Sequence, residues 1–352
     1  MVDWDLAVNT ARRLARPGPE VTLTEAEAAV RELRELAEVA TGHVRQITRM
    51  DAPAETPPTR VVDRHDWVAA NVKGLENLLT PLVTELAAKR PPGRIASTIG
   101  PRMTGLQAGA VLAFLSSKVL GQFEIFAAEG GTLLLVAPNI VEAERSLGVD
   151  PTDFRLWVCL HEVTHRVQFT AVPWLSGYLH GQVAKLVEHT DLDPDALRER
   201  LWTALKEVLG AVKGQHEQGQ GLLALVQTPA QREILDRITA FMSLVEGHAE
   251  YVMDAADASV IPSLPVIRER FQQRRRGSGP LDRLIRKLLG MDLKMRQYSD
   301  GSRFVRGVVD AVGMDGFNVV WTDADTLPKK AELAAPQDWV YRIHGIRPAE
   351  SA

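Results

Sequence analysis

The chain has 352 residues, a formal net charge of −4 at pH 7 and 24% charged residues. This length predicts one large domain or two closely packed lobes, and the charge balance excludes the global basic field by which many proteins attract nucleic acid. The only cysteine, Cys159, excludes an internal disulfide, and no apolar run reaches the roughly 18 residues that span a bilayer. The first residues carry Asp3 and no apolar run, which argues against a signal peptide, so we expect a cytoplasmic protein.

Residues typical of helix starts and helix ends dominate the first part of the chain. Thr24 and Glu27 have the spacing of a capping box, and the apolar residues that follow recur at helical intervals. Prolines within residues 52–60 predict a linker or surface loop. A second helical region covers about 64–89, and it is ended by Pro91-Pro92-Gly93.

The most apolar stretch and the clearest strand follow. Residues 105–126 predict a buried helix, in which Gly105 and Gly109 lie one turn apart and let a neighbouring element approach closely. Residues 132–136 (TLLLV) predict a strand, and a shorter strand is predicted at 318–321. Two interpretations of the 132–136 strand are open: an edge strand that binds an extended peptide by backbone pairing, or an ordinary core strand.

A capped helix then presents two histidines. Asp150-Pro151 is a helix start, with Asp as N-cap and Pro at the first position, and the helix contains the motif HExxH. His161 and His165 lie four residues apart on one face, so both imidazoles can reach one metal ion. Glu162 lies about 100° around the helix, beside the ion, where it can take a proton from a water molecule.

The alternative interpretation is that these histidines are ordinary polar residues. A chance HExxH is expected in on the order of one or two per cent of chains of this kind. An apolar stripe on the opposite face favours the metal site, because it anchors the helix and aims the histidines inward. The stripe consists of Leu156, Leu160, Val163 and Val167.

A catalytic zinc takes three protein ligands, so a third must come from elsewhere in the chain. The Gly and His of the longer HExxHxxGxxH pattern are absent after His165, which excludes that arrangement. A second helix, predicted from near residue 229 to about 256, carries Glu246, Glu250 and Asp254 one turn apart. We take Glu246 as the ligand, with Glu250 and Asp254 behind it to orient the histidines. The arrangement shifted by one turn, with Glu250 as the ligand, is an open alternative.

Residues 246–251 (EGHAEY) resemble the glutamate helix of gluzincin aminopeptidases, in which the Glu before Gly binds zinc. This resemblance implies Glu246 as the ligand, although 80 residues (166–245) separate it from His165, far more than in those enzymes. More broadly, the chain resembles an actinobacterial family of zincin-like metallohydrolases, whose activity is itself inferred from the motif. Some of its members are labelled as associated with deazaflavin-coenzyme biosynthesis. The segments that carry this resemblance are 161–175, 245–254 and 294–328.

The resemblance implies a mainly α fold with a small β-sheet (α+β), a zincin-like fold in which the HExxH helix and a separate glutamate helix meet. We expect an N-terminal helical region at 1–95 and a zincin-like catalytic region at 96–352, packed as one compact unit. Tyr298 is our candidate for a neutral donor to the reacting carbonyl oxygen, with Tyr251 and His248 as competitors.

The residues therefore predict a zinc-dependent hydrolase, and most specifically a metallopeptidase that cleaves peptide or amide bonds. Zn²⁺ would bind at His161, His165 and Glu246, while Glu162 would deprotonate the attacking water and pass the proton to the leaving amine. Two alternatives stay open. One is a non-catalytic or latent zincin-fold binding protein that retains the metal site, and the other is an accessory factor in cofactor metabolism.

Overall fold

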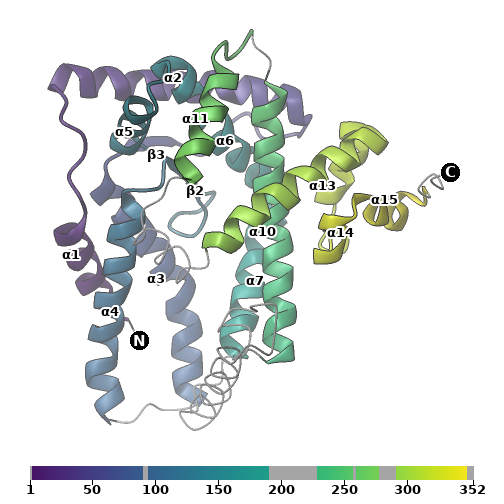
Figure 1. The fold of residues 1–352 in the computed structure, drawn as a ribbon. Coiled ribbons are helices and arrows are strands. Elements are labelled where there is room, and N and C mark those ends of the chain that lie inside the picture. Colours follow the sequence, from purple (N-terminus) through teal and green to yellow (C-terminus); the bar gives the residue numbers. More distant parts are fainter. Residues whose placement is uncertain (1, 90–93, 190–227, 257–258, 277–290, 347–352) are drawn as a thin grey trace, which may run out of the picture.

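The computed structural model describes residues 2–89, 94–189, 228–256, 259–276 and 291–346. These residues form a mainly helical molecule with one small sheet (Figure 1), which confirms the predicted fold class. The strands are β1 (Thr59–Val62), β2 (Gly121–Glu124) and β3 (Thr132–Val136). The helices are α1 (Trp4–Leu14), α2 (Leu23–Thr48), α3 (Arg64–Lys89), α4 (Arg94–Ser116), α5 (Ala137–Leu147), α6 (Pro151–Ala171), α7 (Trp174–Glu188), α10 (Pro229–Ala255), α11 (Leu264–Arg276), α13 (Met291–Phe317), α14 (Lys330–Ala334) and α15 (Pro336–His344), with a 3₁₀ helix η1 (Asn318–Trp321).

The sheet has the strand order β1-β3-β2, so the predicted strand at 132–136 is the central one. β1 runs parallel to it and β2 antiparallel, which leaves β2 at an edge. Leu133 and Leu135 pack into the apolar cluster around α6, while Leu134 and Val136 pack into a second cluster with α1, α3 and α4. The continuous apolar run is therefore the pattern of a strand buried on both faces, and the edge-strand interpretation of 132–136 is wrong.

The sequence analysis did not predict β1 and β2, which are both short. β1 overlaps the predicted loop at 52–60, and β2 lies inside the predicted helix at 105–126, which ends at Ser116. Four residues carry too few alternations to separate a strand from a loop or a helix. The partner of β1 also lies far along the chain, since Thr59 pairs with Leu133. The predicted strand at 318–321 is instead the 3₁₀ helix η1. The capping box of α2 lies two residues earlier than predicted, with Thr22 as the N-cap.

The HExxH helix α6 lies in the interior, in contact with α2, α5, α10, β2 and β3. Gly148 ends α5 in the left-handed conformation, with φ 61°, and Asp150 then caps α6 by accepting the backbone N–H of Asp153. Pro151 follows at the first position, as predicted. The end of α5 and the start of α6 are thus both set by local sequence. The loop between them directs α6 across the sheet face formed by Leu133 and Leu135.

The glutamate helix α10 is crossed by α13 at very short range (Figure 1). The contact is made by two glycines, Gly247 and Gly301. A Cβ placed on Gly247 would lie 2.1 Å from the backbone carbon of Gly301, and one placed on Gly301 would lie 1.8 Å from the carbonyl oxygen of Ser243. Only glycine leaves room for this crossing, which presses α13 against the turn of α10 that carries Glu246.

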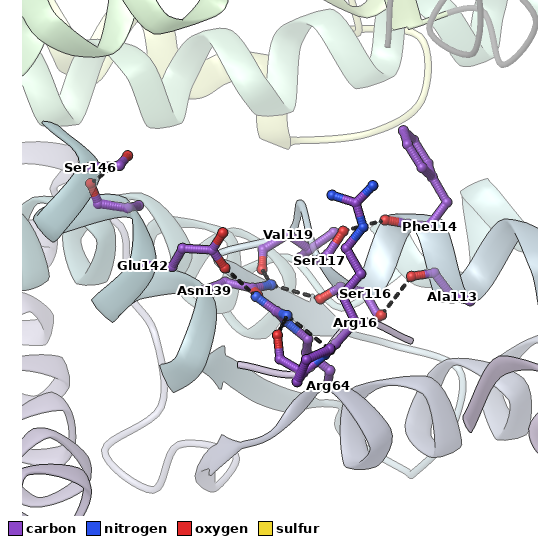
Figure 2. A network of polar contacts seen from close by, with 12 residues as sticks. Arg16, Arg64, Ala113, Phe114, Ser116, Ser117, Val119, Asn139, Glu142 and Ser146 are labelled. Atoms are coloured by element: carbon purple, nitrogen blue, oxygen red, sulfur yellow. Dashed lines mark hydrogen bonds and ion pairs between the residues drawn. The ribbon is translucent and has the colours of Figure 1, made fainter. Parts of the chain in front are cut away.

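A buried polar network ties the N-terminal segment to the centre of the molecule (Figure 2). Arg64 donates to Asn139 Oδ1 at 2.7 Å and to the carbonyl oxygen of Arg16 at 2.9 Å. The Asn139 amide donates to the carbonyl oxygens of Ser116 and Val119, at 2.7 and 2.6 Å. Asn139 thereby satisfies carbonyl groups at the end of α4, which holds α4 against α5.

Each apolar cluster draws residues from both sides of the predicted boundary between 95 and 96. The larger one joins Leu33 with Phe154, and the smaller one joins Ala11 with Leu112. The division of the chain into two regions stays a prediction. Within the part of the chain that the structure describes, no helix is long and apolar enough to cross a membrane.

Candidate metal centre

The two histidines of α6 face each other in the middle of the helix, and both are partly buried. Their ring planes are nearly perpendicular, at 87°, with centroids 4.8 Å apart. The Nε2 atoms of His161 and His165 are 3.2 Å apart. Helical spacing alone predicts neighbouring side chains, and the structure adds that both Nε2 atoms are directed at the same point.

Glu246 reaches the same point from α10. Its Oε2 lies 3.4 Å from His161 Nε2 and 3.7 Å from His165 Nε2. A capping box begins α10 at Thr228, and the apolar stripe of the helix buries it against α6, so that Glu246 is only 7% exposed. The structure thus brings together the three residues predicted as ligands, across 80 intervening residues (166–245).

The spacing of the three donor atoms fits a tetrahedral metal ion. Zinc bonds of about 2.0–2.1 Å imply donor atoms roughly 3.3–3.5 Å apart along the edges of a tetrahedron. The distances between the donor atoms of His161, His165 and Glu246 are 3.2, 3.4 and 3.7 Å. Two imidazoles and one carboxylate also form a donor set that suits zinc. Among the described residues, the group of potential ligands consists of these three, as in sites that keep a fourth position open.

Glu162 lies against the edge strand β2, close enough to the group for its charge to raise the pKa of His165. It is 7% exposed. A Cβ placed on Gly121 of β2 would lie 2.6 Å from Glu162 Cγ and 2.8 Å from Glu162 Cδ. The backbone of β2 therefore passes directly over the Glu162 side chain, and an edge strand, rather than the central strand considered in the sequence, borders the candidate site.

Gln168 and His248, which the sequence did not single out for this role, support His165. The Gln168 Oε1 atom lies 2.9 Å from His165 Nδ1. The Gln168 amide nitrogen donates to the carbonyl oxygen of Val245 and contacts His248 Nδ1, both at 3.0 Å. The signal in the sequence was a glutamine three residues after the second histidine, where it shares a helix face with that histidine.

The surroundings of His165 favour its protonated, positively charged form, whereas those of His248 oppose it. Burial lowers the pKa of His165, but hydrogen bonding to Glu246 and the charges of Glu246 and Glu162 outweigh it, so that the pKa is raised overall. Burial, with a smaller effect of His165, lowers the pKa of His248 to about 3. The two carboxylates thus create a negative potential where the three donor atoms converge, which suits a cation.

The sequence comparison identifies the family. The profile of the zincin-like metallopeptidases matches residues 2–340, nearly the whole chain. The chain belongs to the zincin-like metallopeptidase family. A crystal structure from Chloroflexus aurantiacus, described as that of a candidate hydrolase with a novel fold, is similar to this zincin-like chain. The two share 28% sequence identity with a TM-score of 0.70, over 98% of this chain and 99% of that one. No curated protein matches the sequence.

Asp254 and Glu250 were predicted to orient the histidines of the zincin-like site. Asp254 forms ion pairs with Arg268 and Arg306, so these arginines occupy the carboxylate that was predicted to help orient a histidine. His161 Nδ1 instead lies 3.1 Å from Met253 Sδ. Glu250 and Asp254 line a pocket of about 490 Å³ together with Arg303 and Arg306 of α13, and none of the three candidate ligands lines it. The orienting role of Glu250 stays a prediction.

Tyr298, Cys159 and His248 were also considered for roles at the site. The Tyr298 side chain lies outside the described residues, so its role as a donor stays a prediction. Cys159 is fully buried, and burial raises the pKa of its thiol far above the usual range, which excludes a nucleophilic role at neutral pH. His248 is fully buried and bonded to Gln168, so it supports the site from behind rather than facing a substrate.

Proposed function

We propose that this zincin-like protein is a zinc-dependent hydrolase, and specifically a metallopeptidase that cleaves peptide or amide bonds. The observation that carries the proposal is the convergence of His161, His165 and Glu246 at tetrahedral spacing, with Glu162 close enough for its charge to raise the pKa of His165. Membership of the zincin-like metallopeptidase family supports the reaction class. His161, His165 and Glu246 would hold the zinc ion.

When bound, zinc supplies Lewis acidity, which polarises the carbonyl group to be cleaved and lowers the pKa of a water molecule. Glu162 then acts as the general base: it takes a proton from the water as the water oxygen bonds to the carbonyl carbon. The same carboxyl group returns the proton to the nitrogen as the carbon–nitrogen bond breaks. The products are a carboxylic acid and an amine. The burial of Glu162 suits both steps, since it limits exchange of the proton with solvent.

The outer edge of β2, with which no strand of the described residues pairs, supports an extended peptide as the substrate. The Val136 amide donates to the carbonyl oxygen of Leu120, so in an antiparallel pair the ladder bonds alternate from Leu120 to Gln122 and Glu124. The backbone groups of Gly121 and Phe123 consequently face away from β3. A peptide pairing with these groups would run past Glu162, which lies against Gly121.

The metal ligands are tested by the zinc content of the purified protein. We expect about one zinc ion per chain in the wild type and in Glu250→Ala, and loss of zinc in Glu246→Ala, because among the described residues Glu246 is the one that completes the three-donor group. Retention of zinc by Glu246→Ala together with its loss from Glu250→Ala would establish the arrangement shifted by one turn.

Catalysis is tested separately with a library of peptides. We expect cleavage by the zinc-loaded wild type and none by Glu162→Gln, which keeps the side-chain shape and the metal ligands but cannot take the proton. A zinc-loaded wild type that cleaves no peptide or amide would favour the non-catalytic or latent alternative. The cytoplasmic location, the actinobacterial origin and the link to deazaflavin-coenzyme biosynthesis stay predictions.

A further inference from the structure

We propose that Gln168 is a positioning residue, held in one orientation by Val245 and His248, that makes His165 present an unprotonated Nε2 to the metal. The inference rests on the proposed function for its consequence, zinc binding. Its structural content, the position of a proton on one ring of this chain, can be measured without metal.

The direction of the Gln168 amide follows from its partners. The Val245 carbonyl oxygen, 3.0 Å away, can only accept, so the atom facing it must be the amide nitrogen of Gln168. The amide oxygen then faces His165 Nδ1 at 2.9 Å. Because an oxygen can only accept here, His165 Nδ1 must carry the hydrogen. In the neutral ring, Nε2 is therefore the atom with the free lone pair, and it faces Glu246.

The Val245 carbonyl excludes the alternative orientation, and His248 takes up the second hydrogen of the amide. The Gln168 amide nitrogen has two hydrogens, and the second is directed at His248 Nδ1, 3.0 Å away. The ring of His248 is itself packed against Phe317 and Trp321, with centroid separations of 5.2 and 5.4 Å. If the amide turned over, its oxygen would face the Val245 carbonyl oxygen, and the bond to His165 would lose its acceptor. Both donors of the amide are thus used to hold it, and the oxygen is left for His165.

The contacts also join the two helices that carry the ligands. Gln168 lies three residues after His165 on α6, while Val245 and His248 flank Glu246 on α10. Gln168 and His248 are fully buried, so water does not compete for these hydrogen bonds. The amide therefore fixes the ring of His165 and the separation of α6 from α10 at the level of the ligands.

Among the described residues, His161 has no amide partner like the one that holds His165. His161 Nδ1 lies against Met253 Sδ at 3.1 Å, and a thioether is a weak acceptor. The two imidazoles are therefore unequal, and we expect His165 to be the ring whose tautomer is fixed before the metal binds.

The direct test needs no variant. Ring nitrogen-15 spectra of the metal-free wild type, recorded at a pH where the ring is neutral and assigned by comparison with His165→Gln, should show His165 protonated at Nδ1. Protonation at Nε2 instead would overturn the proposal, whatever the protein does with zinc. If the ring has the expected tautomer but the wild type binds no zinc, the proposed function fails while this inference stands.

Variants test the consequence for zinc binding, measured by competition with a chelator. Gln168→Met keeps the length of the side chain but removes the acceptor, and we expect zinc to bind about 10–100-fold more weakly. Gln182→Met is the matched control, since Gln182 is a buried glutamine on α7, and it should leave the zinc affinity unchanged. An unchanged affinity in a folded Gln168→Met would contradict the proposal.

Gln168→Glu separates positioning from packing. A carboxylate still accepts from His165 Nδ1, so we expect the His165 tautomer to be retained and zinc affinity to exceed that of Gln168→Met. The variant cannot donate to His248, whose ring should change to the form protonated at Nδ1. A merely structural role predicts equal damage from both substitutions and no change at His248. His248→Phe should weaken zinc binding in the wild type but add little to Gln168→Met, because it acts through the same amide.

Discussion

The contact between Gly121 and Glu162 predicts that a single methyl group on the edge strand will impair catalysis without removing the metal. In Gly121→Ala, the new Cβ would lie 2.6 Å from Glu162 Cγ, 2.8 Å from Glu162 Cδ and 3.0 Å from the carbonyl oxygen of Leu134. The backbone of Leu134 belongs to the central strand and cannot move away. The flexible Glu162 side chain must give way instead.

The size of the effect follows from the displacement. Carbon atoms in ordinary contact lie about 3.5–4.0 Å apart, so Glu162 must shift by about 1 Å to relieve the contact. A misplacement of this size at a reacting group costs on the order of 100-fold in rate. Overpacking adds a destabilisation of about 1–3 kcal/mol. Neither effect touches His161, His165 or Glu246, so zinc should remain bound.

The assay is kcat on a cleaved peptide, measured alongside zinc content and Tm. We expect Gly121→Ala to lose about 100-fold in kcat while keeping its zinc. Gly181→Ala is the matched control, because a Cβ on this α7 glycine meets nothing within 4 Å, and its activity should be unchanged. Full activity in a folded, zinc-loaded Gly121→Ala would refute the placement of Glu162 as the general base against β2.

Three other predictions concern stability and reactivity. Gly247→Ala places a Cβ 2.1 Å from the backbone of Gly301, where no side chain can yield, so we expect a loss of about 3 kcal/mol in urea unfolding and weaker zinc binding. Cys159 is buried and burial raises the pKa of its thiol, so a thiol reagent should label it only when the protein unfolds, and rapid labelling of the native protein would contradict this. Burial raises the pKa of Glu124 despite hydrogen bonds from Phe126 and Ala127, which lower it. The charged form is therefore disfavoured in the fold, and the unfolding free energy of the wild type should rise relative to Glu124→Gln as the pH falls through this raised pKa. A difference independent of pH would show that Glu124 titrates as in the unfolded chain.

Local sequence determined the two helices that carry the candidate site. Asp150 and Pro151 specify the start of α6, and the four-residue spacing of His161 and His165 puts both rings on one face. The second helix was predicted from near residue 229 to about 256, and α10 spans Pro229–Ala255. Helix-capping residues and apolar periodicity act within a few residues. The start, the end and the buried face of a helix can therefore be predicted without knowing what the helix packs against.

The tertiary structure decided which groups meet. Glu246 and Glu250 lie one turn apart, and only the packing of α10 on α6 brings the first of them to the histidines. The same holds for β2, whose four residues form a strand because β3 pairs with them, and for Gln168, whose partners lie 77 and 80 positions away. The hydrogen bonds of Gln168 join residues that are remote in the chain. β2 is close to β3 in the sequence, but it is a strand through its pairs with β3 and not through its own four residues, so it too depends on how the elements pack together.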